Sequence, residues 1–288
     1  IGTAAIVSIG PIVYPVLLKQ GYGRGFSAGL ILAASTLAML VPPSVSMILY
    51  SLATNTSVGG VFLSGLSAGL VFLVLLMLYC YLYAKIKQTE RHSKASWQER
   101  LVSLKESGWS LGLPLIIFGG IYAGTFTPTE AASGACVYSI FVETVIYRKL
   151  KFRDLFNVTE KSAILISSLL ILLTAGSALA YFMALQDIPQ LISGFMEGSS
   201  PTQVLLSINV LFLIAGMFVD PNSVIIVLTP LFAPIAQAVA IDPLHLGAVV
   251  VLNVAIGMMT PPFGLNLFIG MATFKVPFLE LCRGILPY

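Results

Sequence analysis

Two pairs of adjacent prolines interrupt apolar runs of this chain, and their surroundings are well placed to bind a cation. Pro42-Pro43 breaks one run and Pro261-Pro262 breaks another, with 261 − 42 = 219. Proline has no backbone N–H and clashes with the preceding helical turn, so two in succession leave several carbonyl oxygens without hydrogen bonds. In an apolar environment such oxygens are costly unless they are coordinated, and a dehydrated sodium ion can coordinate them. The breaks therefore predict two cation-binding points.

Asp220 is the acidic residue that stands out, because it lies between two apolar runs. An ionisable side chain at membrane depth is by default read as functional. Asp220-Pro221 is also a typical helix start, with an acidic N-cap and proline at the first helical position. Ion ligation and capping are compatible, and both stay open here. Asn222 and Ser223 add neutral oxygens at the same tip. The polar residues beside the breaks are weaker candidates: Ser44, Ser46, Thr260 and Asn266.

The segments that must position these residues recur at the same spacing. Shifting the chain on itself by 219 residues superposes Pro11 on Pro230 and Pro15 on Pro234 without a gap. Paired, proline-interrupted apolar segments in two halves of a chain are typical of transporter binding sites. A simple kink at each Pro-Pro pair is the alternative, but it does not account for paired hairpins. The second copy predicts a re-entrant hairpin and a broken helix, with limbs at 203–219 and 224–240 and helices at 244–258 and 265–274.

The amino-acid composition indicates whether this protein lies in water or in a membrane. Of its 288 residues, 57% are hydrophobic and 9% are charged, and the mean hydropathy is +0.96. Soluble domains carry about a quarter charged residues, so we predict an all-α polytopic membrane protein whose helices satisfy their own backbone groups. The chain has neither a basic face for nucleic acid nor enough histidine and clustered cysteine for a soft-ligand metal site.

Lysine and arginine set the predicted orientation. They are concentrated in loops near 85–107 and 148–161, which we expect to be cytoplasmic, and Lys19 and Arg24 place the first turn on that side. An odd number of crossings then separates the two Pro-Pro units, so the repeat is predicted to be inverted. The five crossings are 26–54, 61–84, 109–125, 130–147 and 162–184.

The repeat divides the chain into three predicted regions. Residues 1–60 form the first transport-domain repeat, 61–198 the connecting and scaffold or arm helices, and 199–288 the second repeat with an interfacial end. Since residue 220 corresponds to residue 1, the first limb of the first hairpin is expected to precede Ile1. We therefore expect this chain to be the C-terminal portion of a longer protein.

Two groups of polar residues are interpreted as structural. Thr127-Pro128-Thr129-Glu130 has the spacing of a capping box rather than of a catalytic group. Asp187 and Glu197 flank an amphipathic stretch, 185–198, that we expect at the outer interface. An intramembrane aspartyl protease would need a second carboxylate beside Asp220. Glu143 is the only other acid well inside a predicted span, so an enzyme is a remote alternative and we predict none.

Four blocks of the sequence resemble the large membrane subunit of tripartite ATP-independent periplasmic (TRAP) transporters, in the order found in that family. They read LVPPSVSMILYSLATNTSVGGVFLSG, GGIYAGTFTPTEAA, GMFVDPNSVIIVLTPLFAPIA and IDPLHLGAVVVLNVAIGMMTPPFGLNLF. The resemblance implies a multi-pass protein of the bacterial inner membrane that works as an elevator-type, sodium-driven symporter without any cofactor. It also implies two partners, a small four-helix membrane subunit and a periplasmic binding protein. The implied substrates are organic anions such as dicarboxylates, sialic acid and other sugar or keto acids.

In that family sodium lies between each hairpin tip and the facing helix break. Carried onto this chain, the resemblance implicates Gly2 and Thr3 with Pro42, Pro43 and Ser44, and Asp220 and Asn222 with Met259, Thr260 and Pro262. A divalent-anion/sodium symporter that needs no binding protein shares such hairpins and is the near alternative. A passive channel fits less well, because ligand-like tips suit occlusion better than continuous conduction.

Overall fold

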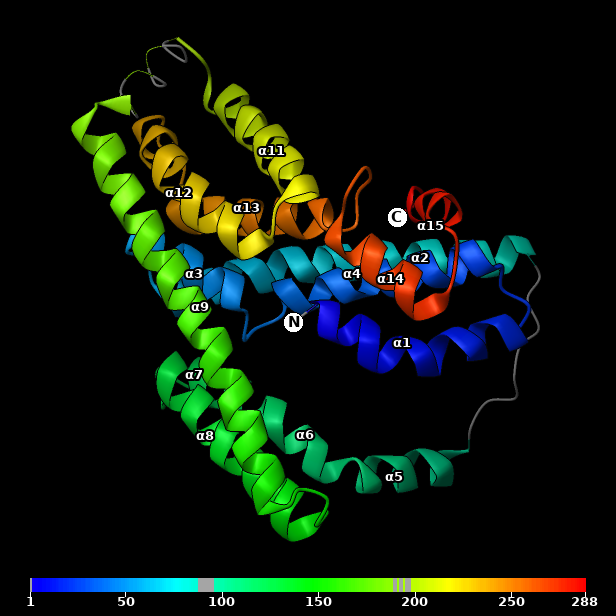
Figure 1. Ribbon diagram of the computed structural model, residues 1–288. Helices are drawn as coiled ribbons and strands as arrows, with labels where there is room; N and C mark the ends of the chain where they lie inside the picture. Colours follow the sequence, from blue (N-terminus) through cyan, green and yellow to red (C-terminus); the bar gives the residue numbers. More distant parts are fainter. Residues whose placement is uncertain (1, 88–95, 189–190, 192–193, 195–197) are drawn as a thin grey trace. The chain divides into compact units, whose positions relative to one another are not determined.

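The computed structural model describes the whole chain except residues 1, 88–95, 189–190, 192–193 and 195–197 (Figure 1). Helices make up its regular secondary structure, and the described residues contain no strand. This confirms the prediction of an all-α protein. The chain splits into two compact units, Ile1–Glu90 with Thr174–Tyr288 and, separately, Arg91–Leu173. Half of the stretch 185–198 lies outside the described residues, as do residues 88–95 of the loop 85–107.

The larger unit holds both proline-broken segments. Its first segment begins with α1 and α2, breaks at Pro42-Pro43 with a bend of 42°, and continues into α3 and α4. Both Pro-Pro bonds, at this break and at Pro261-Pro262, are cis. The helices of this segment are α1 (Gly2–Lys19), α2 (Arg24–Leu40), α3 (Val45–Thr54) and α4 (Val58–Lys87).

The second segment has the same order of helices, preceded by one more. α11 (Pro201–Phe218) and α12 (Pro221–Ala238) pack against each other as a hairpin whose tip is Val219-Asp220. α13 (Pro243–Gly257) then leads to the break at Pro261-Pro262. After the break come α14 (Leu265–Phe274) and the short α15 (Phe278–Ile285).

The two segments correspond closely in helix length and helix ends. α1 and α12 each have 18 residues, and both their starts (221 − 2) and their ends (238 − 19) are 219 apart. α3 and α14 each have ten residues. Each of these ends on a residue in the left-handed region, Asn55 and Lys275, both with φ of 53°.

The helices of one segment pack against counterparts in the other. α1 contacts α14 while α12 contacts α3, and α4 contacts α13 while α15 contacts α2. Exchanging the two segments turns each contact into its partner. The long-range packing of this unit is therefore reciprocal, which an accidental sequence echo would not produce.

Helix α4 runs from the connection between α12 and α13 to the connection between α1 and α2. Near its C-terminus, Tyr83 stacks on Phe26 with ring centroids 3.7 Å apart, just after the α1–α2 turn. Near its N-terminus, Gly60 abuts Leu244, and a Cβ on that glycine would lie 3.0 Å from the leucine side chain. Leu244 follows the α12–α13 turn, so the two turns lie at opposite ends of α4.

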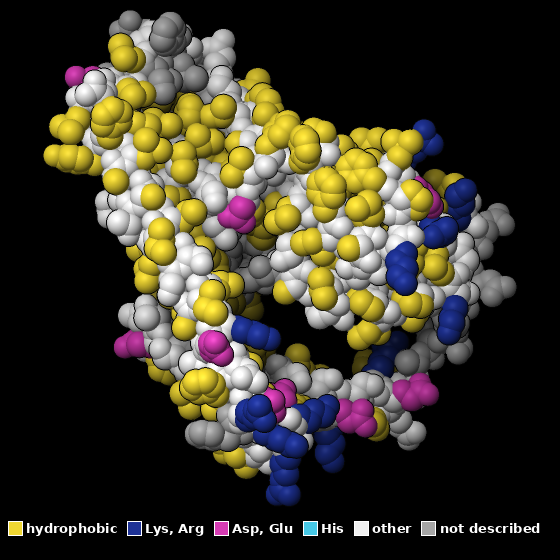
Figure 2. Space-filling view, viewed as in Figure 1, with side chains coloured by type: hydrophobic (Ala, Val, Ile, Leu, Met, Phe, Trp, Pro, Cys, Tyr) yellow, Lys and Arg dark blue, Asp and Glu magenta, His cyan; other side chains and the backbone are white. Residues whose placement is uncertain are grey.

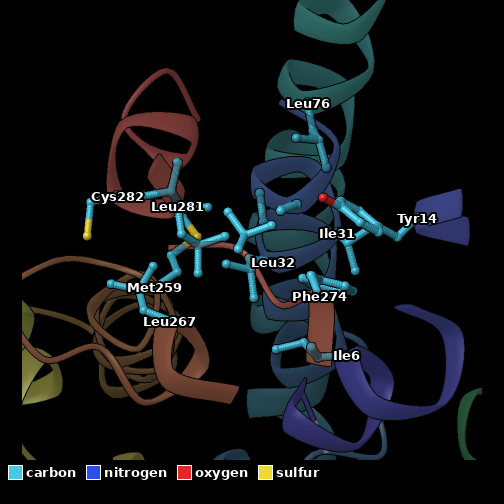
Figure 3. Close-up of a cluster of buried hydrophobic side chains, with 14 residues drawn as sticks. Ile6, Tyr14, Ile31, Leu32, Leu76, Met259, Leu267, Phe274, Leu281 and Cys282 are labelled. Atoms are coloured by element: carbon cyan, nitrogen blue, oxygen red, sulfur yellow. The ribbon is translucent and has the colours of Figure 1, made fainter. Parts of the chain in front are cut away.

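A buried cluster of apolar side chains joins α1, α2, α4, α14 and α15 (Figure 3). Tyr14 of α1 stacks on Phe274 of α14 with ring centroids 4.8 Å apart. Leu32 and Leu267 are completely buried in it, and Met259 reaches it from the second break. The cluster thus connects the first repeat to the second break.

The smaller unit contains short helices with two π-helical turns. Thr127 caps α8, and the Glu130 carboxylate accepts hydrogen bonds from the Thr127 N–H and Oγ1, both at 2.8 Å. This confirms the capping box. α5 was not predicted, although Ser96 and Glu99 form a capping box at its start. The elements are α5 (Trp97–Glu106), α6 (Gly108–Pro114), η1 (Leu115–Gly119), α7 (Gly120–Tyr122), α8 (Pro128–Phe141), η2 (Val142–Ile146) and the first part of α9 (Phe152–Leu185).

Several helices are suited to a bilayer by length and composition. In the described part of the chain, five helices are long and apolar enough to cross a membrane. The number rises to as many as eight if each bent helix pair counts as one span. Apolar side chains are spread widely over the visible face of the larger unit (Figure 2). These features support the prediction of a polytopic membrane protein.

Candidate ion and anion site

The second hairpin tip is built around Asp220. Its Oδ2 accepts hydrogen bonds from the Ser223 N–H at 3.1 Å and from the Ser223 hydroxyl at 3.2 Å. The carboxylate therefore caps α12, with Pro221 at the first helical position. Asp220 is exposed and uses one oxygen for capping, and its other oxygen remains available to a cation. The capping role is confirmed, and ion ligation stays a prediction.

Backbone carbonyl oxygens gather at the second break. A Cβ on Gly264 would lie 2.7 Å from the Met258 oxygen and 2.8 Å from the Thr260 oxygen, so both point toward the same space beside this glycine. The Met258 oxygen also accepts from the Asn266 N–H at 2.9 Å. The Thr260 hydroxyl donates to the Ile256 oxygen at 2.7 Å instead of facing outward. The backbone of this break, more than its side chains, supplies ligand-type oxygens.

The second tip lies beside its own break. Phe218, at the end of α11, and Phe263, within the break, have ring centroids 5.3 Å apart. Close by, Gly216 and Gly257 bring the backbones of α11 and α13 together, since a Cβ on Gly257 would lie 2.7 Å from the Gly216 carbonyl carbon. These contacts place Asp220 and the break in one neighbourhood.

The same tip also contacts the first repeat. Ser46, the second residue of α3, donates to the Asn222 Oδ1 at 3.1 Å. Asn222 is likewise the second residue of α12. This hydrogen bond spans 176 residues of sequence and brings two helix N-termini together.

A matching junction forms at the first tip. Gly2, which begins α1, lies so close to α2 that a Cβ there would be 3.0 Å from the Ser35 oxygen and 3.9 Å from the Asn266 Nδ2. Asn266 is the second residue of α14, and its Nδ2 donates to the Ser35 Oγ at 3.5 Å. Its Oδ1 is fully buried and has no hydrogen-bond partner among the described residues. A buried acceptor in that state suits a bound ion or ligand.

The remaining predicted residues lie at these junctions or beside them. Ser44 is buried and caps α3, with its Oγ accepting from the Met47 N–H at 3.5 Å. Pro42 and Met259 are buried, Pro43 and Pro262 are exposed, and Thr3 is half-buried in the first turn of α1. The roles carried onto these residues by the resemblance stay predictions.

Sequence reasoning missed three contributors to this region. Ser35, the Met258 carbonyl and Gly264 belong to it through the contacts above. Ser35 gives no sequence signal, because a serine in an apolar helix commonly bonds its own backbone, here the Leu32 oxygen at 2.6 Å. Gly264 does give one, since a glycine two residues after a Pro-Pro pair often marks close backbone approach.

The geometry can bind both signs of charge. Four helices of eight residues or more, α1, α14, α3 and α12, present their N-termini in two pairs. Unpaired N–H groups and the positive dipole end favour an anion at such points. Carbonyl oxygens and one carboxylate lie beside them and favour a cation. A transition-metal site is not supported, because the described residues hold no cluster of three or more His, Cys, Asp or Glu.

Comparison with known proteins assigns the chain. The model of the family "Tripartite ATP-independent periplasmic transporter, DctM component" matches residues 2–288. The ectoine TRAP transporter large permease protein TeaC of Halomonas elongata is 41% identical over 288 residues, which are 99% of this chain and 67% of that protein. The C4-dicarboxylate permease DctM of Pseudomonas aeruginosa is 39% identical over 287 residues, 99% of this chain and 67% of that protein. The sialic acid permease SiaM of Vibrio cholerae is 35% identical over 268 residues, 92% of this chain and 63% of that protein. The chain therefore belongs to the DctM family, the large membrane subunits of TRAP transporters.

Proposed function

We propose that this chain is the membrane subunit of a sodium-coupled secondary transporter that imports organic anions delivered by a periplasmic binding protein. One observation carries the proposal: two pairs of helix N-termini meet at Asn222–Ser46 and at Gly2–Asn266, and the Met258 carbonyl of the second break lies at the second pair. The N-termini suit a carboxylate group, and the carbonyls suit sodium. An ion and an anion that bind side by side stabilise each other electrostatically, which couples their transport.

The two segments of the larger unit are proposed to be inverted repeats. Matched helix lengths, reciprocal packing and turns at opposite ends of α4 support this. In the elevator mechanism implied by the resemblance, the part that holds both tips would slide across the bilayer with its ions and substrate. The reciprocal packing suits such motion, because it makes the two half-sites parts of one body.

The proposed substrate is a small organic acid. The relatives are named for ectoine, C4-dicarboxylates and sialic acid, so membership of the family does not select one of them. Family membership implies a tripartite system with a small membrane subunit and a periplasmic binding protein. We propose four helices for the small subunit, and we propose that the binding protein contributes much of the selectivity.

Family membership also decides among the alternatives. The DctM family consists of transporter permeases, so the prediction that the chain is not an enzyme is confirmed. A multi-pass membrane location is supported as well, and bacterial relatives imply the inner membrane. The symporter that works without a binding protein is not favoured by any contact described for the larger unit.

Replacing Asp220 tests the proposal. We expect Asp220→Ala to raise the sodium concentration needed for half-maximal uptake by at least about ten-fold, or ~1.4 kcal/mol. The same shift should appear in sodium-dependent thermal stabilisation of the purified protein, because a ligand that binds only the folded state raises its stability. Choline replaces sodium in the reference buffer.

Asp242→Ala is the matched control. Asp242 likewise caps a helix that begins with proline, Pro243. Its side chain accepts hydrogen bonds from the Leu244 and His245 N–H groups at the start of α13. Its loss removes a cap, which costs about 1 kcal/mol, and leaves the sodium response unchanged. If both variants raise the required sodium concentration equally, Asp220 only caps α12 and does not bind sodium. Absence of any sodium response in the wild-type protein would refute the coupling itself.

A further inference from the structure

A pair of asparagines links α11 to α13 through the interior of the second repeat. The Asn253 Nδ2 donates to the Asn209 Oδ1 at 2.7 Å and also to the Val249 oxygen at 2.8 Å. The Asn209 Nδ2 donates in turn to the Leu205 oxygen at 2.7 Å. Asn253 is only 8% exposed, so these amides have few other partners available. Polar side chains that bond between helices are a main source of helix association in membranes.

Two glycines continue this link toward the tip. A Cβ on Gly216 would lie 3.1 Å from the Val254 Cα, and a Cβ on Gly257 would lie 2.8 Å from the Gly216 Cα. The helix backbones therefore touch with no side chain between them. Gly216 is four residues before Asp220, and Gly257 ends α13 just ahead of the break. This contact is thus made where the tip meets the break.

The counterpart of α13 in the first repeat carries other residues at these positions. Asn253 and Gly257 correspond, at the spacing of 219, to Ala34 and Ala38 of α2. The Ala34 side chain cannot donate a hydrogen bond. The amide that α13 supplies to this link is therefore specific to the second repeat.

We infer that the Asn209–Asn253 hydrogen bonds and the Gly216–Gly257 contact form a clamp that positions the second tip against its break. The clamp, defined by these four residues, makes α11 and α13 move as one body. The cation site at the second tip is then preorganised, and the tip does not open as a gate. This inference rests on the proposed function for its link to sodium, although the clamp itself is a matter of geometry.

Cross-linking across the tip tests the clamp without sodium. Phe218→Cys and Phe263→Cys replace the two touching rings, in a background where Cys80, Cys136 and Cys282 are changed to alanine. In the full-length transporter in choline, a short thiol cross-linker should join them in high yield. Adding Asn253→Leu should lower the initial rate of cross-linking by about three- to ten-fold, the factor that an interhelical hydrogen bond in a membrane supplies. Ser207→Ala, an exposed α11 residue that bonds its own helix at the Gln203 oxygen, should leave the rate unchanged.

The second readout separates positioning from stability. Asn253→Leu should raise the sodium concentration for half-maximal thermal stabilisation by a similar factor, beyond any fall of the melting temperature in choline. Asn209→Leu combined with Asn253→Leu leaves no buried amide unpaired, and it replaces the single variant if that fails to fold. The cross-linked pair should keep its sodium response, because the tip does not need to open.

Each outcome decides something. An unchanged cross-linking rate in the asparagine variants, or a poor yield in their absence, overturns the clamp. A cross-link that abolishes the sodium response until it is cleaved shows that the tip is a gate, which also overturns it. If the wild-type protein has no sodium response, the proposed function fails and the cross-linking rates alone judge the clamp.

Discussion

At the scale of single residues, the proposed site offers mainly neutral oxygens. Ser46 and Asn222 meet at one pair of helix N-termini, with Asp220 at the same tip, and Asn266 lies at the other pair. A site crowded with carboxylates would repel an organic anion, whereas amides and carbonyls coordinate sodium without that penalty. We therefore expect the charge balance of the occupied site to come mainly from the ions it binds.

Asn266 is predicted to matter for binding and hardly at all for folding. Its Oδ1 is buried without a partner among the described residues, and its side-chain hydrogen bond to Ser35 is long at 3.5 Å. Replacing a poorly satisfied buried amide with an apolar side chain of similar size is close to neutral for stability. Asn266→Leu should change the stability in choline by less than about 1 kcal/mol and lower anion uptake at least about ten-fold. Uptake is measured in proteoliposomes with the cognate binding protein and its anion.

Thr229→Val provides the comparison for that variant. The Thr229 hydroxyl is also buried and also lacks a partner among the described residues, but it lies more than a turn into α12. Normal uptake by this variant alongside impaired uptake by Asn266→Leu supports a ligand role. A large loss of stability in Asn266→Leu, with uptake in proportion to the folded protein, would count against it.

At the scale of helices and their breaks, proline positions made much of the fold predictable. The limbs predicted at 203–219 and 224–240 are α11 (Pro201–Phe218) and α12 (Pro221–Ala238), within a few residues. Local rules suffice there, because proline, capping residues and apolar length act within one helix. α5 was missed because it lies in a charged stretch interpreted as a loop, although Trp97, Leu101 and Leu104 recur there at helical spacing.

The pairing of helices was less accessible to sequence reasoning. The resemblance paired each tip with the break of its own repeat, and the Phe218–Phe263 contact fits that. Hydrogen bonding from Ser46 to Asn222 and the approach of Gly2 to Asn266 cross between the repeats. Such contacts depend on how distant helices pack, for which a single sequence carries no local signal. The sodium positions themselves remain predictions.

Gly264 is predicted to keep the second break open for a cation. Any side chain there would enter the space beside the Met258 and Thr260 oxygens, at 2.7 and 2.8 Å. Gly264→Ala should therefore raise the sodium concentration for half-maximal thermal stabilisation at least about ten-fold. Gly23→Ala is the matched control, since Gly23 also precedes a helix and has nothing within 4 Å of its Cβ position. Equal sodium dependence in the two variants would show that the second break is not part of the cation site.

At the scale of the whole molecule, the proposal of an inverted repeat depends on which side of the membrane holds the α1–α2 turn and which holds the α12–α13 turn. Around the α1–α2 turn, the aromatic rings of Tyr22, Phe26 and Tyr83 stack, and Lys19 and Arg24 are exposed. Aromatic rings with basic residues are typical of a cytoplasmic interface. The α12–α13 turn lies at the other end of α4 and carries Asp242 instead.

Cysteine labelling tests this topology with one residue from each repeat. Lys19 and Ala238 end α1 and α12, are both exposed, and correspond at the spacing of 219. In a background without the three native cysteines, a membrane-impermeant maleimide should label Ala238→Cys in intact spheroplasts. Lys19→Cys should react only after the membrane is permeabilised, because the positive-inside rule places that turn in the cytoplasm. Labelling of both from the same side would contradict the inverted repeat, since turns at opposite ends of a spanning α4 cannot share one aqueous compartment.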